Sequence, residues 1–231
     1  TERALTVATD GSVSAEALIR FSLLSALSTQ NDPPEKASKP FSKDRDGFVI
    51  AEGAATLVLE SLESAIARGA KVLGIIKGAG EKADSFHRTR SSPDGGPAIA
   101  TIRAALADAG VAEGDINYIN AHGTSTPEND KMEYGSMLAV FGEGLKNIPL
   151  SSNKSMIGHT LTAAGAVEAV FSLQTMLTGT LPPTINYNNP DPTITLNVVP
   201  NVKRDSEVGA VLSNSFGFGG QNASLVMTRE P

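Results

Sequence analysis

Between Gly47 and Thr228 the chain alternates short apolar runs with segments of helical spacing, and this alternation limits the possible folds. Strands that alternate with helices indicate an α/β domain layered around a largely parallel sheet. The segment 161–177 is nearly uncharged and rich in alanine, so we expect a helix that is buried on most sides. The last two strands, 210–213 and 223–228, are close enough in sequence to form an antiparallel pair.

The ends of the other expected elements follow from residues that start or stop regular structure. Pro97 suits a first helical turn because it lacks an N–H, and Gly110 suits the end of the same helix. A helix over 14–27 precedes a polar segment, 28–46, whose length indicates a functional loop or a connector. The remaining expected strands are 48–50, 54–59, 72–76, 116–120 and 148–151, and the remaining helices are 62–68 and 128–141.

Composition excludes several classes of function. The 231 residues include no cysteine, which rules out disulfides, thiolate metal sites and a cysteine nucleophile supplied by these residues. The net charge of −6 argues against general nucleic-acid binding. We also expect no membrane span and no signal peptide, because no apolar run has the required length or flanks. These features together favour a cytoplasmic protein.

Residues 120–127 form a polar stretch directly after an expected strand. The stretch places His122 beside the hydroxyls of Thr124 and Thr126, at the strand end where α/β sheets border a ligand crevice. The alternative is a loop whose threonines only cap the helix that starts near Glu128. Taken alone, the stretch leaves both interpretations open.

Two further stretches have a functional and a structural interpretation. Residues 151–160 contain Lys154 and His159 and lead into the apolar helix. The positive end of the helix dipole favours a neutral imidazole, which can donate a hydrogen bond to an oxyanion. The alternative is that these residues only provide polar capping of a core helix. The glycine-rich residues 214–222 either present backbone N–H groups to a ligand or form a hairpin turn. The histidines have no metal-binding spacing, so we expect no metal site.

In combination and in order, these stretches closely resemble the C-terminal half of a β-ketoacyl-acyl-carrier-protein synthase of the elongating kind. The resemblance implies a thiolase-type α/β fold, of which this chain supplies a five-stranded mixed sheet with helices on both faces. Residues 1–46 then correspond to the trailing helix and loop of an N-terminal half, and residues 47–231 to the C-terminal half. The motifs that carry the resemblance are 26–32, 44–49, 120–127, 153–159 and 214–220, and 182–186 also fits.

The resemblance implies a decarboxylating Claisen condensation between an acyl thioester and malonyl-acyl carrier protein. His122 and His159 correspond to the two histidines that stabilise the enolate, and Lys154 corresponds to a lysine that organises the site electrostatically. Phe218 corresponds to the residue whose backbone N–H completes an oxyanion hole. The resemblance also assigns Thr124 and Thr126 to the phosphopantetheine arm, Phe21 to the acyl pocket, Phe216, Gly217 and Gly219 to a mobile gate, and Glu168 to a supporting role.

The resemblance also implies partners for the chain. They are acyl carrier protein, whose phosphopantetheine carries the substrates, an N-terminal half that supplies the cysteine, and a second copy in a homodimer; no other cofactor is implied. Ser25 stands where many relatives carry an arginine that faces the carrier protein. Arg88 and Arg90 either hold the phosphopantetheine phosphate or the acidic carrier, or belong to a solvated loop.

Two alternatives fit a cysteine-free chain. A non-catalytic partner that shapes chain length needs no cysteine, but it also has no need of both His122 and His159. A malonyl decarboxylase without condensation activity would keep both histidines. On the first interpretation, the isolated 231-residue chain should lack condensation activity and expose an apolar face that lowers its solubility.

Overall fold

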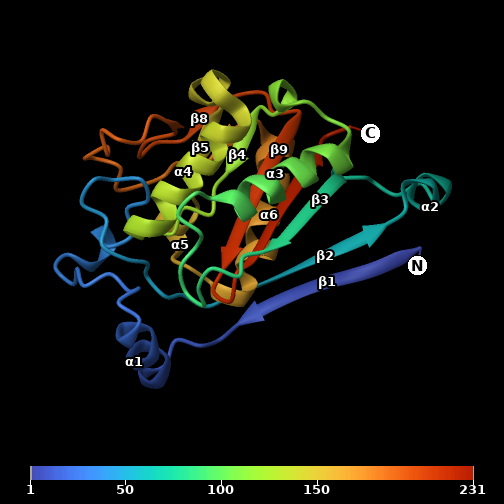
Figure 1. Cartoon of the computed structure of the whole chain (residues 1–231). Coiled ribbons are helices and arrows are strands. Elements are labelled where there is room, and N and C mark those ends of the chain that lie inside the picture. The colour runs from blue at the N-terminus through green and yellow to red at the C-terminus, as the bar shows by residue number, and fades with distance from the viewer. Residues whose placement is uncertain (1, 231) are drawn as a thin grey trace.

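The computed structural model describes residues 2–230, and its centre is a six-stranded mixed sheet with the order β3-β10-β9-β4-β5-β7 (Figure 1). The sheet and its helices confirm the α/β class, but the expected five strands are six because a two-residue strand, β7, pairs with β5. The parallel strands are β4 (Tyr118–Asn120), β5 (Pro149–Ser151), β7 (Asn197–Val198) and β9 (Ala210–Gly217); β10 (Gln221–Thr228) is antiparallel to both β9 and β3 (Ile75–Ala83).

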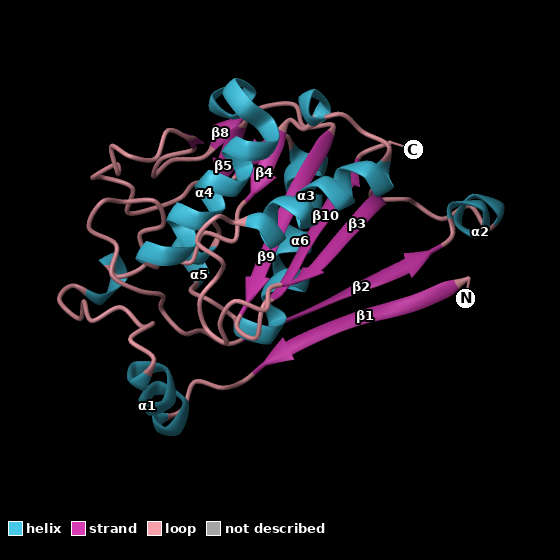
Figure 2. Ribbon diagram, in the orientation of Figure 1, coloured by secondary structure: helices cyan, strands magenta, loops and turns pink. Residues whose placement is uncertain are grey.

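Helices cover both faces of this sheet (Figure 2). Successive strand residues point to opposite faces, so Ile119 packs into the core with α3 (Gly96–Ala109) and α4 (Pro127–Phe141). Its neighbour Tyr118 packs into a second core with α6 (Ala164–Thr178). The expected antiparallel pair of final strands is confirmed by the pairing of β9 with β10.

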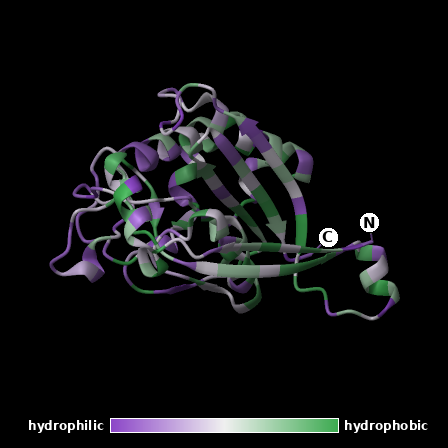
Figure 3. Cartoon of the chain, turned by 90° about the horizontal axis from the view of Figure 1, so that it is seen from below, coloured by the Kyte–Doolittle hydropathy of each residue, from purple (hydrophilic) through white to green (hydrophobic). Residues whose placement is uncertain are grey.

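The apolar helix α6 is covered on two sides, as its composition predicts. One side packs on β9 and β10, and the other packs on the antiparallel ribbon of β1 (Arg3–Asp10) and β2 (Gly53–Glu60). Figure 3 views the molecule from the side of this ribbon. The outer face of the ribbon exposes Leu5, Val7 and Val58, each more than 60% accessible, which is the kind of apolar face expected from the sequence.

Several predicted boundaries are wrong. Residues 48–50 form only isolated bridges, to Leu27 and His159, and the expected strand 72–76 is replaced by β3, which begins at Ile75. Gly78 weakens the sequence signal for β3, yet it is required there, because a Cβ would lie 2.3 Å from the backbone nitrogen of Ala109 in α3. The strand β1 was not expected at all. Helix 14–27 is shortened to α1 (Ala15–Leu23).

Short elements complete the chain. The two-residue strands β6 (Thr180–Leu181) and β8 (Arg204–Asp205) pair with each other. Within residues 2–230, no helix is long and apolar enough to cross a bilayer. The other helices are α2 (Leu62–Ala67) and α5 (Lys154–Ile157), with 3-10 turns at Pro34–Lys36, Glu113–Asp115, Gly142–Asn147 and Leu161–Ala163.

Candidate active site

His122 lies in the loop that leaves the carboxyl end of β4, and its side chain is buried. The carboxylate of Glu133, on α4, fixes this loop by accepting the backbone N–H of His122 and that of Gly123, each at 2.8 Å. Asn214 on β9 donates to the same carboxylate at 3.3 Å. Burial raises the pKa of Glu133 to about 7, against the lowering effect of the backbone donors. No sequence motif marks Glu133 as part of the site.

Lys154 lies beneath His122 and is almost completely buried. Its Nζ donates to the His122 carbonyl at 2.7 Å, contacts His122 Nδ1 at 3.3 Å, and forms an ion pair with Glu168 of α6. These three acceptors match the three N–H groups of an ammonium. Because Nδ1 of a neutral His122 accepts from Lys154, its ring proton is on Nε2. Burial raises the pKa of Glu168.

His159 is held by a different set of backbone bonds. Its N–H donates to the Val49 carbonyl at 2.7 Å, and its carbonyl accepts from Ala51 at 3.0 Å. Nδ1 accepts the backbone N–H of Leu161 at 3.1 Å, so a neutral His159 also carries its proton on Nε2. The two imidazole centroids are 5.3 Å apart at an interplanar angle of 86°. Two imidazole donors therefore face one region of the molecule.

Both imidazoles are kept neutral. Burial, followed by the charge of Lys154, lowers the pKa of His159 to about 3 and that of His122 well below its usual value. The predicted neutrality is thus supported. The 3-10 turn Leu161–Ala163 runs directly into α6, so His159 lies just before the helical segment, as predicted. Desolvation is the largest cause of the lowered pKa, and the charge of Lys154 is the next.

We expect neither of these imidazoles to titrate between about pH 5 and pH 8 in the folded protein, because their lowered pKa values lie below this range. Histidine-selective ¹⁵N NMR across this range should show Nδ1 unprotonated and Nε2 protonated throughout for His122 and His159. In urea the same imidazoles should titrate near their ordinary value of about 6.5. A folded-state transition near neutral pH would contradict the assignment.

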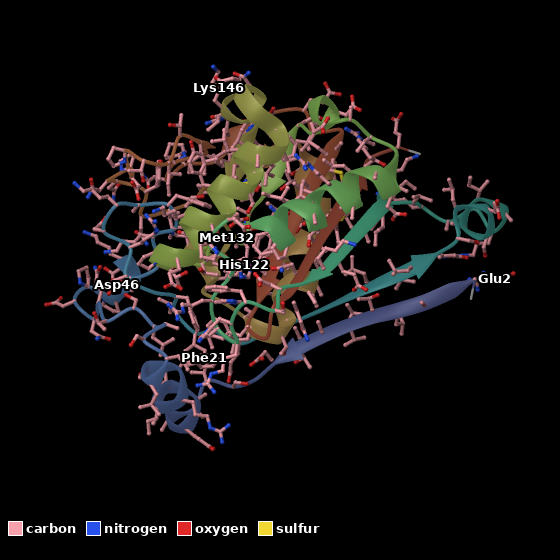
Figure 4. The ribbon with its side chains drawn as sticks, in the orientation of Figure 1. Glu2, Phe21, Asp46, His122, Met132 and Lys146 are labelled. Carbon is pink, nitrogen blue, oxygen red and sulfur yellow. The ribbon has the colours of Figure 1, made fainter. Side chains whose placement is uncertain are left out.

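The two histidines line an open cleft of about 2380 Å³, together with the predicted aromatic residues. The Phe216 ring lies 5.7 Å from the His122 ring, and the half-exposed Phe218 lies 6.4 Å from Phe21. Figure 4 shows Phe21 on α1, on the side of the molecule toward His122. Among residues 2–230, the Phe218 N–H donates to no protein acceptor. The cleft is also lined by Thr124, Thr126 and Gly217; Lys154 and Glu168 lie behind its wall, and Gly219 lies in the turn beyond it.

Thr124 and Thr126 satisfy both interpretations of their stretch. Both line the cleft, and their hydroxyls are 2.8 Å apart. Thr126 also caps α4, because its Oγ1 accepts the N–H of Asn129 at 3.2 Å. Arg90 lines the cleft as well. The exposed Arg88 accepts the Gly219 N–H at 2.7 Å through its carbonyl, so the basic loop touches the glycine-rich turn.

The two glycines of this turn offer a matched pair of variants. Both have positive φ, +88° at Gly219 and +78° at Gly220, but a Cβ at Gly220 would lie 1.9 Å from the Asp84 carbonyl, whereas Gly219 has open space. Gly219→Ala should cost about 1 kcal/mol of unfolding free energy from strain alone. Gly220→Ala should cost clearly more, measured by urea unfolding; equal losses would contradict the close approach.

Comparison with known families identifies this arrangement. The model described as "Beta-ketoacyl synthase, C-terminal domain" matches residues 73–188, about half of the chain, and the model of the N-terminal domain matches residues 1–65. The chain belongs to the beta-ketoacyl synthase family. In this beta-ketoacyl synthase chain, the match to the N-terminal model ends at residue 65 and the match to the C-terminal model begins at residue 73. The boundary between the two family domains therefore lies between β2 and β3, and both histidines belong to the C-terminal domain.

Individual relatives agree with this assignment. The chain is 49% identical to 3-oxoacyl-[acyl-carrier-protein] synthase 2 of Rhizobium meliloti, over 96% of its own length and 52% of the relative. It is 47% identical to the enzyme of the same name from Coxiella burnetii, over 90% and 50%. The chain therefore spans about half the length of the curated relatives it matches.

Solved structures show the same fold. A beta-ketoacyl synthase from Burkholderia phymatum superposes with a TM-score of 0.93 at 39% identity, covering 99% of this chain and 55% of that one. A ketosynthase determined in complex with its type II polyketide acyl-carrier protein superposes with a TM-score of 0.96 at 37% identity, covering 99% and 56%. These neighbours support the thiolase-type fold implied by the sequence motifs.

Proposed function

We propose that this chain provides the two-histidine half of a 3-oxoacyl-acyl-carrier-protein synthase, which condenses an acyl thioester with malonyl-acyl carrier protein in fatty-acid elongation. One observation carries the proposal: His122 and His159 each use Nδ1 as an acceptor within the protein, which leaves two neutral Nε2–H donors at one cleft. Two fixed donors suit a carbonyl oxygen on which negative charge develops.

The proposed reaction uses these donors in its first step. The bond between the malonyl Cα and its carboxylate breaks, CO₂ leaves, and the electron pair moves into the thioester to form an enolate. Hydrogen bonds from His122 and His159 stabilise the enolate oxygen more strongly than the starting carbonyl, and this difference accelerates the step. Lys154 holds the His122 tautomer and disfavours an imidazolium through its charge.

The second step joins the two substrates. The enolate carbon attacks the carbonyl of an acyl group held on a cysteine, and the cysteine thiolate leaves. We assign the Phe218 N–H as one donor to the tetrahedral oxyanion. The cysteine belongs to the part of the relatives' length that this chain does not span. The apolar outer face of the β1–β2 ribbon, with Leu5, Val7 and Val58, is suited to packing against that part.

We assign substrate contacts by position in the cleft. Thr124 and Thr126 contact the phosphopantetheine arm, Phe21 contacts the acyl chain, and the turn with Phe216, Gly217 and Gly219 gates the acyl pocket. Acyl carrier protein delivers both substrates, no further cofactor takes part, and the complete enzyme is a cytoplasmic homodimer. The structural neighbour solved with an acyl-carrier protein supports this choice of partner.

The complete native protein provides the test. Its intact mass should be near twice the 23.9 kDa of this chain, with a cysteine in the added part. Incubation with acyl- and malonyl-carrier protein should release CO₂ and form the 3-oxoacyl product. CO₂ release without condensation would identify a malonyl decarboxylase. The absence of both CO₂ and the 3-oxoacyl product would favour a non-catalytic partner; two structurally similar proteins were solved as complexes of a ketosynthase with a chain length factor.

Arg88 and Arg90 are proposed to contact the acidic carrier or its phosphate, because both are exposed on the loop that reaches the gate turn. Replacing both by alanine should raise KM for acyl-carrier protein by about tenfold, since each exposed charge-assisted contact contributes roughly 0.7 kcal/mol and about 1.4 kcal/mol corresponds to a factor of ten. The kcat value should change little. An unchanged KM would assign the two arginines to a solvated loop.

A further inference from the structure

The segment 38–51, here called the strap, makes hydrogen bonds to the backbone of Lys154 and of His159 and to Ser125, in the loop that carries His122, although it supplies none of the polar side chains of the site. Most of the strap has the composition of a polar loop, yet residues 38–42 are all buried. Near its start, Ser38 Oγ donates to the Lys154 carbonyl at 2.8 Å. The backbone N–H groups of Lys39 and Gly47 donate to Ser125 Oγ and to the Ser125 carbonyl, each at 3.0 Å. Near its end, the Val49 carbonyl accepts the His159 N–H at 2.7 Å, and the Ala51 N–H donates to the His159 carbonyl at 3.0 Å.

Arg45 fastens this strap to the loop that carries His122. The Arg45 side chain is 6% exposed. It donates to the carboxylate of Asp191 at 2.8 Å and approaches that of Asp130 at 3.5 Å. It also donates to three backbone carbonyls, those of Ser42 (2.8 Å), Pro127 (3.2 Å) and Thr126 (3.3 Å). A planar guanidinium can serve this many acceptors in fixed directions, whereas a lysine ammonium cannot reproduce the fork.

A second contact leads from the strap to His122. The backbone N–H of Phe41 donates to Asp130 at 2.8 Å, and the Phe41 ring packs directly under Gly123, where an added Cβ would lie 3.1 Å from the ring. Gly123 follows His122 and has φ of +38°. The middle of the strap therefore supports the loop that carries His122, and the C-terminal end of the strap holds His159.

We propose that Arg45 is a positioning residue that sets the distance between His122 and His159 by fixing the strap. The inference rests on the proposed function. The two imidazoles come from different elements, and a two-donor site works only if both N–H groups reach one oxygen. Misplacement by about 1 Å can cost on the order of 100-fold in rate. Because the strap contacts both the loop that carries His122 and the backbone of His159, its position sets the positions of both imidazoles.

The test compares Arg45→Lys with Arg103→Lys in the complete native enzyme. Arg103 is an exposed arginine of α3 that donates to a single helix carbonyl, at 3.1 Å, away from the strap. Arg45→Lys should lower kcat for malonyl decarboxylation by about tenfold or more, while acyl transfer to cysteine and the activity of Arg103→Lys stay near wild type. Added guanidinium should restore decarboxylation in Arg45→Ala, which a general loss of folding would not allow.

A folded Arg45→Lys enzyme with wild-type decarboxylation would overturn the proposal, as would Arg45→Ala that stays folded but is not rescued. If Arg45→Ala does not fold, Asp191→Asn removes the negative charge of one partner of the guanidinium and should also lower decarboxylation. A wild-type enzyme without decarboxylation would contradict the proposed function instead. Imidazole ¹⁵N shifts would then decide the inference separately: they should move in Arg45→Lys and not in Arg103→Lys.

Discussion

Replacing His122 by alanine in the complete enzyme is expected to lower malonyl decarboxylation by about 10² to 10³-fold, the cost of removing one preorganised oxyanion donor. Acyl transfer to the cysteine should stay measurable, because that step does not form the malonyl enolate. Loss of the ring leaves a cavity and removes the acceptor that lies 3.3 Å from Lys154 Nζ, so a small loss of stability should accompany the loss of rate.

The measurement separates the two half-reactions. Release of ¹⁴CO₂ from labelled malonyl-carrier protein reports decarboxylation, and labelling of the cysteine by acyl-carrier protein reports transfer. His159→Ala should resemble His122→Ala, and the double variant should lose much less than the product of the two effects, since both donors serve one oxygen. His87→Ala, in an exposed loop, is the control for loss of an imidazole. An equal loss of both half-reactions would argue against the assigned role.

The convergence of His122 and Lys154 was predictable from sequence for a simple reason. His122 and Lys154 follow β4 and β5, which are parallel neighbours, so their polar ends meet at one edge of the sheet. The near-absence of charge in α6 likewise predicted a buried helix, and the helix is enclosed by a sheet and a ribbon. The lone charge of that helix, Glu168, has a buried cation as its partner.

Other features gave no usable signal. Nothing in the sequence distinguishes the fully buried Glu133 from the exposed Glu128 on the same helix, because the partners of Glu133 are backbone N–H groups of another segment. The strap was equally hidden, because its polar composition is typical of a solvated loop. The pairing of Leu5 with Val58 shows why β1 was missed: an apolar strand face that remains exposed does not produce the usual alternation.

Removing the lysine charge should have the largest effect on stability. Lys154→Met leaves Glu168 buried without a cation, and breaking a buried pair in this way costs about 3 to 5 kcal/mol. Urea unfolding of the complete protein measures this loss. Lys146→Met is the matched control, since its ion pair with Glu143 is exposed and screened by solvent, so its loss should change the free energy of unfolding little.

The pH dependence tests the cause. Burial raises the pKa of Glu168 in the folded protein, and loss of Lys154 removes the charge that opposes this rise. Below the unfolded-state pKa of about 4.3 the carboxyl is neutral in both states, so the variant pays no ionisation penalty there. As pH rises toward the raised folded-state pKa, the unfolded state releases its proton first, and Lys154→Met should lose stability relative to wild type.

A double variant separates the charge from the packing. Lys154→Met with Glu168→Leu removes both members of the pair, and replacing a buried ion pair by apolar side chains is often close to neutral in stability. The double variant should therefore be more stable than Lys154→Met, yet still impaired in decarboxylation, because His122 Nδ1 has lost the donor that fixes its tautomer. Recovery of stability and activity together would assign the lysine a purely structural role, and a double variant no more stable than the single one would show that the unpaired carboxylate is not the source of the loss.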